Sequence, residues 1–300
     1  MKIIKPVVIT DTMITSSNIA GSSYAEWVNT TAYTAGQKVK IDAIHNEYEC
    51  LIANTGEDPT QNTVDGSGNP YWLDIGSTND WALFDGKARN PSVNANNITI
   101  TIKPNKLTNS LAIINFNSGA LNITATSVEG GGEVYNEDIV VREYVSGWYD
   151  YLLSDIERIS NAVKIDLPAY IDIEITITAT DTGDVSIGEL ILGKSQEIGL
   201  AQYGTSVGIT DYSTKDTDTF GNFTVVERGF ANRIEYDVII ERNKTAYVRK
   251  LLSQYRATPV VYIGEEESPE TITYGYFKRF NIVLQDFANS EMVLEVEELI

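Results

Sequence analysis

Strict alternation of apolar and polar residues marks the middle of the chain as β-structure. Residues 98–102 read Ile-Thr-Ile-Thr-Ile, and residues 171–177 place isoleucine at every second position with carboxylates and threonine between. A period of two puts the apolar side chains on one face of a strand and the polar ones on the other. Both segments therefore predict half-buried strands, with one face on a core and one toward water.

Shorter apolar segments on both sides extend this pattern. We predict further strands at 111–116, 121–126, 139–142, 148–152 and 185–192. Turn-forming residues separate them, including the Gly run 130–132 and the segment Asp181 to Asp184, which we interpret as a hairpin turn. Seven short strands with regular turn signals are typical of a β-sandwich. We therefore assign residues 84–196 to a central β-sandwich.

The last third of the chain, residues 197–300, mixes strands with one helix. Strands are predicted at 223–227, 234–240, 260–263, 276–284 and 292–296. Apolar residues recur at helical spacing between 247 and 255, which predicts a helix over about 244–255. Asn243 is placed to cap its first turn, and Pro259 follows where the helix has ended. This region is predicted to be a β-rich assembly domain with one packed helix.

The first 83 residues divide into an N-terminal arm and a small module. This N-terminal segment, residues 1–23, joins a strand-like stretch from Ile3 to Thr10 to a stretch rich in Ser, Asn and Gly. The module, residues 24–83, contains aromatic residues on short segments. A domain this small has little apolar surface to bury, so most of its aromatic rings must belong to its core. The whole chain is thus predicted to be mainly β, with two or three domains in 300 residues.

Charge narrows the set of partners. The chain carries 42 acidic and 22 basic side chains, for a formal net charge of −20. A surface this acidic repels phosphate backbones, so we expect no nucleic-acid partner. Nothing near 18 consecutive apolar residues occurs, so we expect no membrane span. The apolar stretch at the N-terminus ends by Asp11, too short for a signal peptide, which predicts synthesis and retention in a cytoplasm.

The scarcity of cysteine and histidine limits the chemistry. Cys50 and His45 are the only residues of their kinds, so a zinc site, a Ser-His-Asp triad or a Cys-His dyad would need His45. We interpret His45 as a surface or packing residue. Neither a phosphate-binding Gly-rich loop nor a Gly-x-Ser-x-Gly elbow is present. Residues 216–221 come close to a calcium loop, but Phe220 stands where a ligand is expected.

These absences predict a non-enzymatic protein with no catalytic residue, no metal and no cofactor. The 42 acidic residues offer many candidate carboxylate pairs for glycoside hydrolysis, but no spacing singles one out. A polysaccharide depolymerase is therefore kept only as a less favoured alternative.

The order of aromatic residues in the module resembles a known family. Trp27, the pattern Tyr-x-x-Gly-x-x-Val that begins at Tyr33, Tyr48 on the next strand and a closing Trp72 recur in chitin- and cellulose-binding modules of the type 5/12 family. In such modules, exposed rings stack on the apolar face of sugar rings. The resemblance implies Trp27, Tyr33, Tyr48 and Trp72 as glycan-binding candidates. The insert 62–69 departs from the pattern, and core packing of the two tryptophans is the alternative.

A second resemblance touches most of the chain. The opening strand from Val7 to Ser17 and the hinge from Trp72 to Asp85, with its Trp-Leu-Asp-x-Gly and Trp-Ala-x-Phe-Asp elements, frame the module. Segments 185–193, 202–204 and 218–222 continue the likeness. Together they resemble a family of tail-associated phage virion proteins with an inserted sugar-binding-like module. By strand count, the middle of the chain also resembles a galactose-binding or discoidin-type jelly roll.

The resemblance implies a structural component of a bacteriophage virion, from its tail, collar or baseplate. Such a protein is made in the bacterial host cytoplasm and then resides in the tail region of the virion. Its expected partners are further copies of itself, in a homo-oligomer that buries β edges, and other virion proteins such as tail, collar or fibre components. The alternative is a glycan-binding adhesin whose main role is to recognise a host cell-surface glycan.

Overall fold

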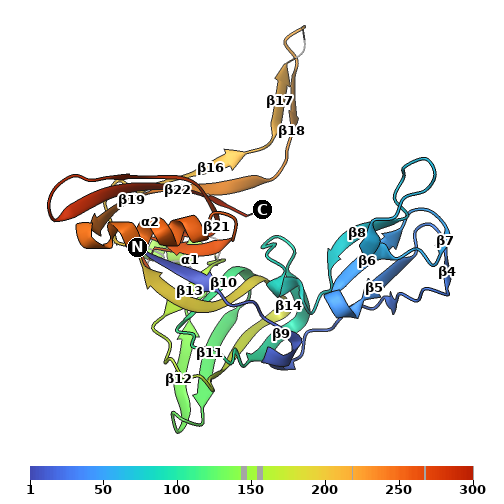
Figure 1. Cartoon of the computed structure of the whole chain (residues 1–300), viewed down its shortest axis with the longest axis horizontal. Helices are drawn as coiled ribbons and strands as arrows, with labels where there is room; N and C mark the ends of the chain where they lie inside the picture. Colours follow the sequence, from blue (N-terminus) through green and yellow to red (C-terminus); the bar gives the residue numbers. More distant parts are fainter. Residues whose placement is uncertain (143–146, 154–157, 218, 267, 300) are drawn as a thin grey trace.

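The protein is a mainly β structure built on one large antiparallel sheet (Figure 1). The computed structural model describes residues 1–142, 147–153, 158–217, 219–266 and 268–299. Within these residues, 53% of the chain is strand, fourteen strands join in the large sheet, and the strands do not close into a barrel. Three small sheets accompany the large one. The prediction of a mainly β fold is confirmed.

Strand β14 (Glu174–Glu197) is the longest element and organises the centre of the molecule. Its first half lies between β9 (Ser92–Ile102) and β11 (Ala120–Ser127), and its second half pairs with β10 (Ser110–Asn117). The register against β9 shifts between Thr180 and Asp184. The predicted hairpin turn at 181–184 is therefore wrong, because these turn-forming residues make a β-bulge inside one continuous strand.

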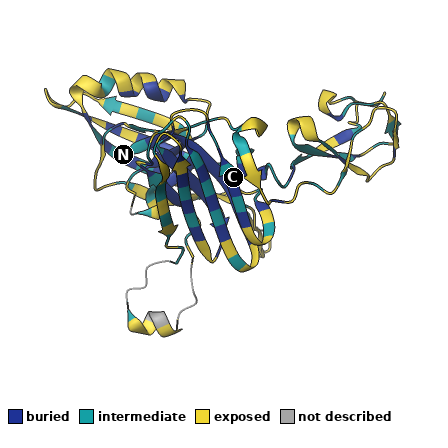
Figure 2. Ribbon diagram, turned by 90° about the horizontal axis from the view of Figure 1, so that it is seen from below, coloured by how far each residue is buried: buried dark blue, intermediate teal, exposed yellow. Residues whose placement is uncertain are grey.

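The alternating segments bury their isoleucines as predicted except at Ile171, which is 62% exposed because β14 begins only at Glu174. Ile98, Ile100 and Ile102 of β9 are fully buried, as are Ile175 and Ile177 of β14. They join side chains of β10, β11 and the second half of β14 in one core. Both halves of β14, before and after the bulge, therefore contribute to the same core. Figure 2 shows the resulting rows of buried positions along the central strands.

Two predicted central strands are wrong. Residues 148–152 lie in a short helix, α1 (Trp148–Leu153), because a brief apolar run does not by itself distinguish a helix from a strand. The strand predicted at 139–142 is not formed, because Ile139 is already the last residue of β12 (Gly132–Ile139). The centre is completed by β2 (Ile14–Ser17), which pairs with β9, and β13 (Ala162–Ile165), which pairs with β10.

The N-terminal strand β1 (Lys2–Pro6) connects the central and C-terminal parts of the sheet. It pairs with β14 on one side and with β20 (Val260–Ile263) on the other. Ile3 contributes to the core of the C-terminal part. Ile4 belongs to a separate core, where the central and C-terminal parts of the sheet meet. One strand of five residues thus contacts two cores.

The C-terminal part continues the sheet and carries the main helix. From β20 the order is β21 (Ile272–Val283), β22 (Asn289–Glu298) and β19 (Phe230–Glu241), followed by the edge strands β15 (Leu200–Ala201) and β16 (Ser206–Asp211). Helix α2 (Thr245–Gln254) packs Val248, Leu251 and Leu252 on one face of this sheet, called the inner face below.

The predicted helix over 244–255 is confirmed, but its predicted cap is wrong. Asn243 lies inside the 3-10 turn Arg242–Lys244 that leads into α2. The capping position is occupied by Lys244, and no side chain bonds there to the helix backbone. The other 3-10 turns are Asp11–Met13, Asp42–Ile44, Pro59–Gln61, Ala82–Phe84 and Pro269–Thr271.

The small module stands to one side of the large sheet (Figure 1). Its four-stranded sheet has the order β3 (Ala25–Glu26), β5 (Lys38–Ile41), β6 (Asn46–Cys50) and β8 (Trp72–Ser77). Strands β4 (Ala32–Tyr33) and β7 (Asn54–Thr55) form a separate pair. Its strand pairs are antiparallel except β3 with β5, which is parallel.

A long hairpin projects from the C-terminal part of the large sheet (Figure 1). Strands β17 (Thr214–Thr217) and β18 (Phe223–Val226) continue β16 and β19 beyond the sheet (Figure 1). We call residues 212–228 the arm.

Candidate functional site

Three of the four predicted glycan-binding residues lie in the core of the module. Tyr33, Tyr48 and Trp72 are only 8%, 6% and 6% exposed, and they pack with Val39 and Cys50. The rings of Tyr33 and Trp72 meet edge to face with centroids 5.2 Å apart. Their polar atoms are used internally as well, since the Trp72 indole donates to the Glu57 carbonyl at 2.9 Å. These rings stabilise the module and offer little surface to a ligand.

The fourth candidate, Trp27, lies at the surface of this core. Its ring is half-buried against the core, and its indole Nε1 is buried without a hydrogen-bond partner among the described residues. Tyr24 is also half-buried, with the Lys38 ammonium 5.7 Å from its ring centroid. Trp27 and Tyr24, at the two ends of strand β3, therefore each keep part of an aromatic ring at the surface.

His45 packs where the module meets the hinge. Its ring stacks on Trp81 with centroids 3.8 Å apart and planes 9° from parallel. Its Nε2 lies 3.0 Å from an Asp11 carboxylate oxygen, and its carbonyl accepts the Thr78 N–H at 2.8 Å. The imidazole therefore joins the module to the N-terminal segment and the hinge. Among the described residues, no group of three or more His, Cys, Asp or Glu side chains is arranged to hold a metal ion.

The single thiol is equally enclosed. Cys50 is fully buried in the module core, and its Sγ donates to the Ile52 carbonyl at 3.2 Å. Burial raises the pKa of this thiol. A protonated, enclosed thiol is a poor nucleophile.

A buried carboxyl group lies beneath the hinge. Glu189 of β14 is 4% exposed, and its Oε2 accepts the Gly86 N–H at 3.0 Å. Burial, together with the nearby Asp85 carboxylate, raises the pKa of Glu189 to about 8. Asp85 itself accepts hydrogen bonds from the Ser77 hydroxyl at 2.7 Å and the Lys87 N–H at 2.7 Å. Nothing in the sequence pattern singled out Glu189, because its environment is formed by residues about one hundred positions away.

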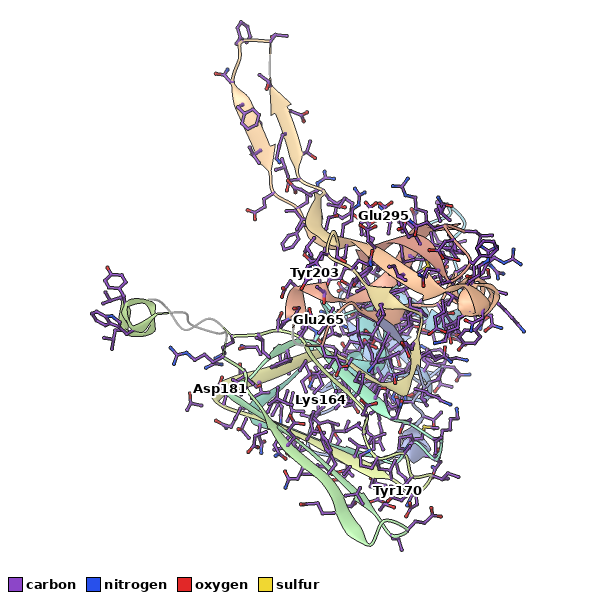
Figure 3. All side chains as sticks on the ribbon, turned by 90° about the vertical axis from the view of Figure 1, so that its left-hand side faces the viewer. Lys164, Tyr170, Asp181, Tyr203, Glu265 and Glu295 are labelled. Carbon is purple, nitrogen blue, oxygen red and sulfur yellow. The ribbon has the colours of Figure 1, made fainter. Side chains whose placement is uncertain are left out.

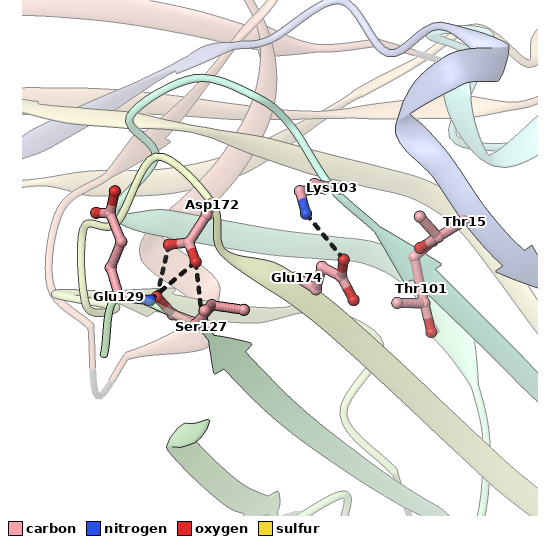
Figure 4. Close-up of polar contacts among 8 residues, drawn as sticks. Thr15, Thr101, Lys103, Ser127, Glu129, Asp172 and Glu174 are labelled. Carbon is pink, nitrogen blue, oxygen red and sulfur yellow. Dashed lines mark hydrogen bonds and ion pairs between the residues drawn. The ribbon is translucent and has the colours of Figure 1, made fainter. Parts of the chain in front are cut away.

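A second polar cluster holds a loop at the far end of the central sheet (Figure 4). Asp172 accepts hydrogen bonds from the Ser127 hydroxyl at 2.6 Å and from the N–H groups of Val128 and Glu129. These bonds lower the pKa of Asp172. Both carboxylate oxygens are used to hold the loop, so the cluster is a structural one.

The arm exposes several bulky apolar side chains. Both of its strands lie almost wholly in water, and Phe220 and Phe223 are 89% and 63% exposed. Val225 and Val226 of β18 are about half exposed, and Figure 3 shows the arm standing clear of the body. The sequence prediction found a strand at 223–227 but missed the hairpin, whose signal is the Phe-Gly-Asn turn between two Thr-containing segments.

The base of the arm is fastened at two points. The Tyr212 hydroxyl donates to the Glu297 carboxylate at 2.5 Å. On the other strand, the Arg89 guanidinium donates to the Phe230 carbonyl and lies 5.5 Å from the Phe230 ring centroid. The arm therefore leaves the body from a fixed base. Of the near-calcium loop at its tip, Asp218 lies outside the described residues.

Ion pairs cover the outer face of the C-terminal sheet, opposite α2. Glu295 is 7% exposed and lies between Arg233 and Arg279, at 2.9 and 2.7 Å. Glu297 pairs with Lys278. Acidic side chains on this face are thus neutralised locally although the chain as a whole is strongly acidic.

Comparisons of the chain with protein-family models, with curated proteins and with solved structures found no match. Within the described residues, no helix combines the length and the apolar character needed to cross a bilayer. A functional assignment therefore depends on the geometry above and on the resemblances in the sequence.

Proposed function

We propose that this protein is a non-enzymatic structural component of a bacteriophage virion, from its tail, collar or baseplate, and that it acts as a homo-oligomer. The observation that carries the proposal is the arm, an exposed two-stranded ribbon with bulky apolar side chains. An isolated two-stranded ribbon is at best marginally stable in water. Packing on another subunit would supply the missing contacts.

The charge of the arm supports contact between copies. Residues 212–228 contain two basic and three acidic side chains, whereas the whole chain carries −20. Two such acidic molecules repel each other over most of their surface. The nearly neutral arm is a place where they can approach, and its apolar side chains favour burial there.

The virion setting rests on the resemblance to tail-associated phage proteins, and other tail, collar or fibre components are the proposed partners. We also infer that the central region is a jelly-roll-like sandwich. Support for this comes from the bulge in β14, since strands on both sides of it contribute to one core.

The proposal is tested by shortening the arm. Tyr212 and Gly229 face each other across its base, with the Tyr212 N–H 3.2 Å from the Gly229 carbonyl. Residues 214–227 can therefore be replaced by an Asn-Gly turn, which suits a tight hairpin. The shortened protein is expected to fold and to remain monomeric, whereas the intact chain oligomerises and is found by mass spectrometry in a fixed copy number per particle. An intact chain absent from particles would overturn the virion assignment.

A second candidate function, glycan recognition, is favoured by Trp27, whose ring is only half-buried. Flat amphipathic rings suit the apolar face of a pyranose. In a pull-down on chitin or cell-wall glycan, Trp27→Ala is expected to lose retention. The variant Trp148→Ala, at an exposed tryptophan of α1, controls for general loss of an indole. Retention of a folded Trp27→Ala variant would remove this candidate.

A further inference from the structure

The C-terminal sheet has two open edges. On one side, β16 pairs with β19, and no other strand of the described chain pairs with it. On the other side, β21 pairs with β20 only from Ile272 to Gly275. Its remaining part, Tyr276–Val283, has β22 as its one strand partner within the described residues. Open edges present unpaired N–H and C=O groups, which are ready to pair with another strand.

The two edges run in opposite directions. Strands β16, β19, β22 and β21 are consecutive neighbours, and each pair is antiparallel. Four alternating strands leave the first and the last pointing opposite ways. A second copy in the same orientation would therefore place its β21 antiparallel to β16 of the first copy, which continues the order of the sheet.

The faces of the two edges also agree. Val207 of β16 is opposite Ile234 of β19, whose side chain belongs to the inner core. On β21, Phe280 and Ile282 pack against the same core. Joining the two edges would set half-exposed Val207 and Ile209 beside the neighbouring copy's apolar inner face.

Electrostatics permits this approach. Lys278 and Arg279, at the β21 edge, are both paired with glutamates of β22. Strand β16 carries one charged residue, Asp211, at its end, and this carboxylate is paired with Lys215 at 2.8 Å. Neither edge therefore brings an unpaired charge to the contact, which keeps the desolvation cost low.

We infer that copies of this chain join head to tail, with the β16 edge of one copy paired to the β21 edge of the next. The contact uses two different surfaces, so it generates a closed ring when the rotation between copies closes. Because the arm continues β16, it then lies along the neighbouring copy. This inference rests on the proposed function, and it goes beyond homo-oligomer formation by naming the two surfaces.

The test blocks each edge separately in the full-length chain. One variant carries Val207→Lys and Ile209→Lys, and the other carries Asn281→Lys and Val283→Lys; all four side chains are exposed. Lysine on an edge strand opposes pairing because its charge would be buried. A control variant carries Val8→Lys and Val128→Lys, at positions that are more exposed than these and lie away from both edges. Circular dichroism verifies that each variant is folded.

Native mass spectrometry then measures the species formed. The wild-type chain and the control are expected to form one closed oligomer, and each edge variant alone is expected to be monomeric. A mixture of the two edge variants is expected to form a heterodimer and nothing larger, because one intact edge of each kind is present.

Three results would overturn the inference. One is a wild-type chain that stays monomeric, and another is an oligomer that survives both edge variants. The third is dimer formation by the Asn281/Val283 variant alone, which would indicate two-fold pairing of β16 with itself. The proposed function is decided separately, by copy number in particles and by the shortened arm.

Discussion

At the scale of single residues, Glu189 makes stability depend on pH. Burial, together with the Asp85 carboxylate beside it, raises the pKa of this carboxyl to about 8 from a usual value of 4.5. Between these two pH values, the folded protein holds a proton that the unfolded chain has released. Stability therefore falls as pH rises through this window.

Replacing Glu189 by Gln should remove this dependence. The amide keeps an acceptor for the Gly86 N–H and cannot ionise. We expect Glu189→Gln to match the wild type near pH 4.5 and to become more stable relative to it toward pH 8, by up to about 1.4 kcal/mol per pH unit. Urea unfolding at a series of pH values measures this difference. Glu291→Gln, at an exposed carboxylate, controls for the loss of one negative charge, and a constant difference across pH would contradict the assignment.

The two module tryptophans should differ in their contribution to stability. Trp72 is buried and hydrogen-bonded, so Trp72→Ala leaves a cavity and should cost about 3–5 kcal/mol. Trp27 is half-exposed, and Trp27→Ala should cost about 1 kcal/mol.

Hydrogen exchange followed by mass spectrometry localises these effects. Faster exchange in β5 and β6 is expected for Trp72→Ala, with β14 unchanged, because the module core shares no residue with the other cores. Equal exchange in the two variants would contradict this division of roles.

At the scale of elements, the close pairing of β1 with β14 requires a glycine. A Cβ atom at Gly193 would overlap the Lys5 carbonyl oxygen and crowd Ile4. Gly193→Ala should therefore displace β1 and destabilise the protein by about 1–3 kcal/mol. Gly183, in the bulge of the same strand, has open space around its Cα, so Gly183→Ala is the matched control and should be neutral or slightly stabilising. Thermal unfolding distinguishes the two, and equal melting temperatures would contradict this account.

The alternation of apolar and polar residues predicted most strands, because one face of each strand is buried and the other is exposed. The strand predicted at 260–263 has the observed bounds, and the predicted helix differs from α2 by one residue at each end. Errors arose where the same local sequence is compatible with two backbone structures. The segment 181–184 suits a turn or a bulge equally, and only the partner strand β9 decides between them.

The candidate sites were harder to predict because they depend on contacts distant in sequence. The aromatic order picked out Tyr33, Tyr48 and Trp72, which share one core, but it did not distinguish these buried rings from the ring of Trp27 at the surface. Stacking of His45 on Trp81 brings together residues 36 positions apart. The open edges of β16 and β21 follow from strand order, which alternation alone does not reveal.

At the scale of the whole molecule, β1 holds the central and C-terminal parts together. Its removal would expose the edges of both β14 and β20 and withdraw Ile3 and Ile4 from two cores. A chain without residues 1–6 is expected to lose several kcal/mol of stability and to unfold in two calorimetric transitions. A synthetic peptide of residues 1–8, added in excess, should restore one transition by strand addition. A single transition at the wild-type temperature would contradict this role.

The position of β1 also sets the order of events during translation. Ile3 leaves the ribosome early, yet its partners Gln196 and Tyr262 are made 193 and 259 residues later. At about 5–20 residues per second, the strand waits for roughly 13–50 seconds before its second neighbour exists. The strands that carry the open edges are likewise among the later products. On the proposed pairing of the β16 and β21 edges, a nascent chain could therefore join another copy only after β21 (Ile272–Val283) has been made.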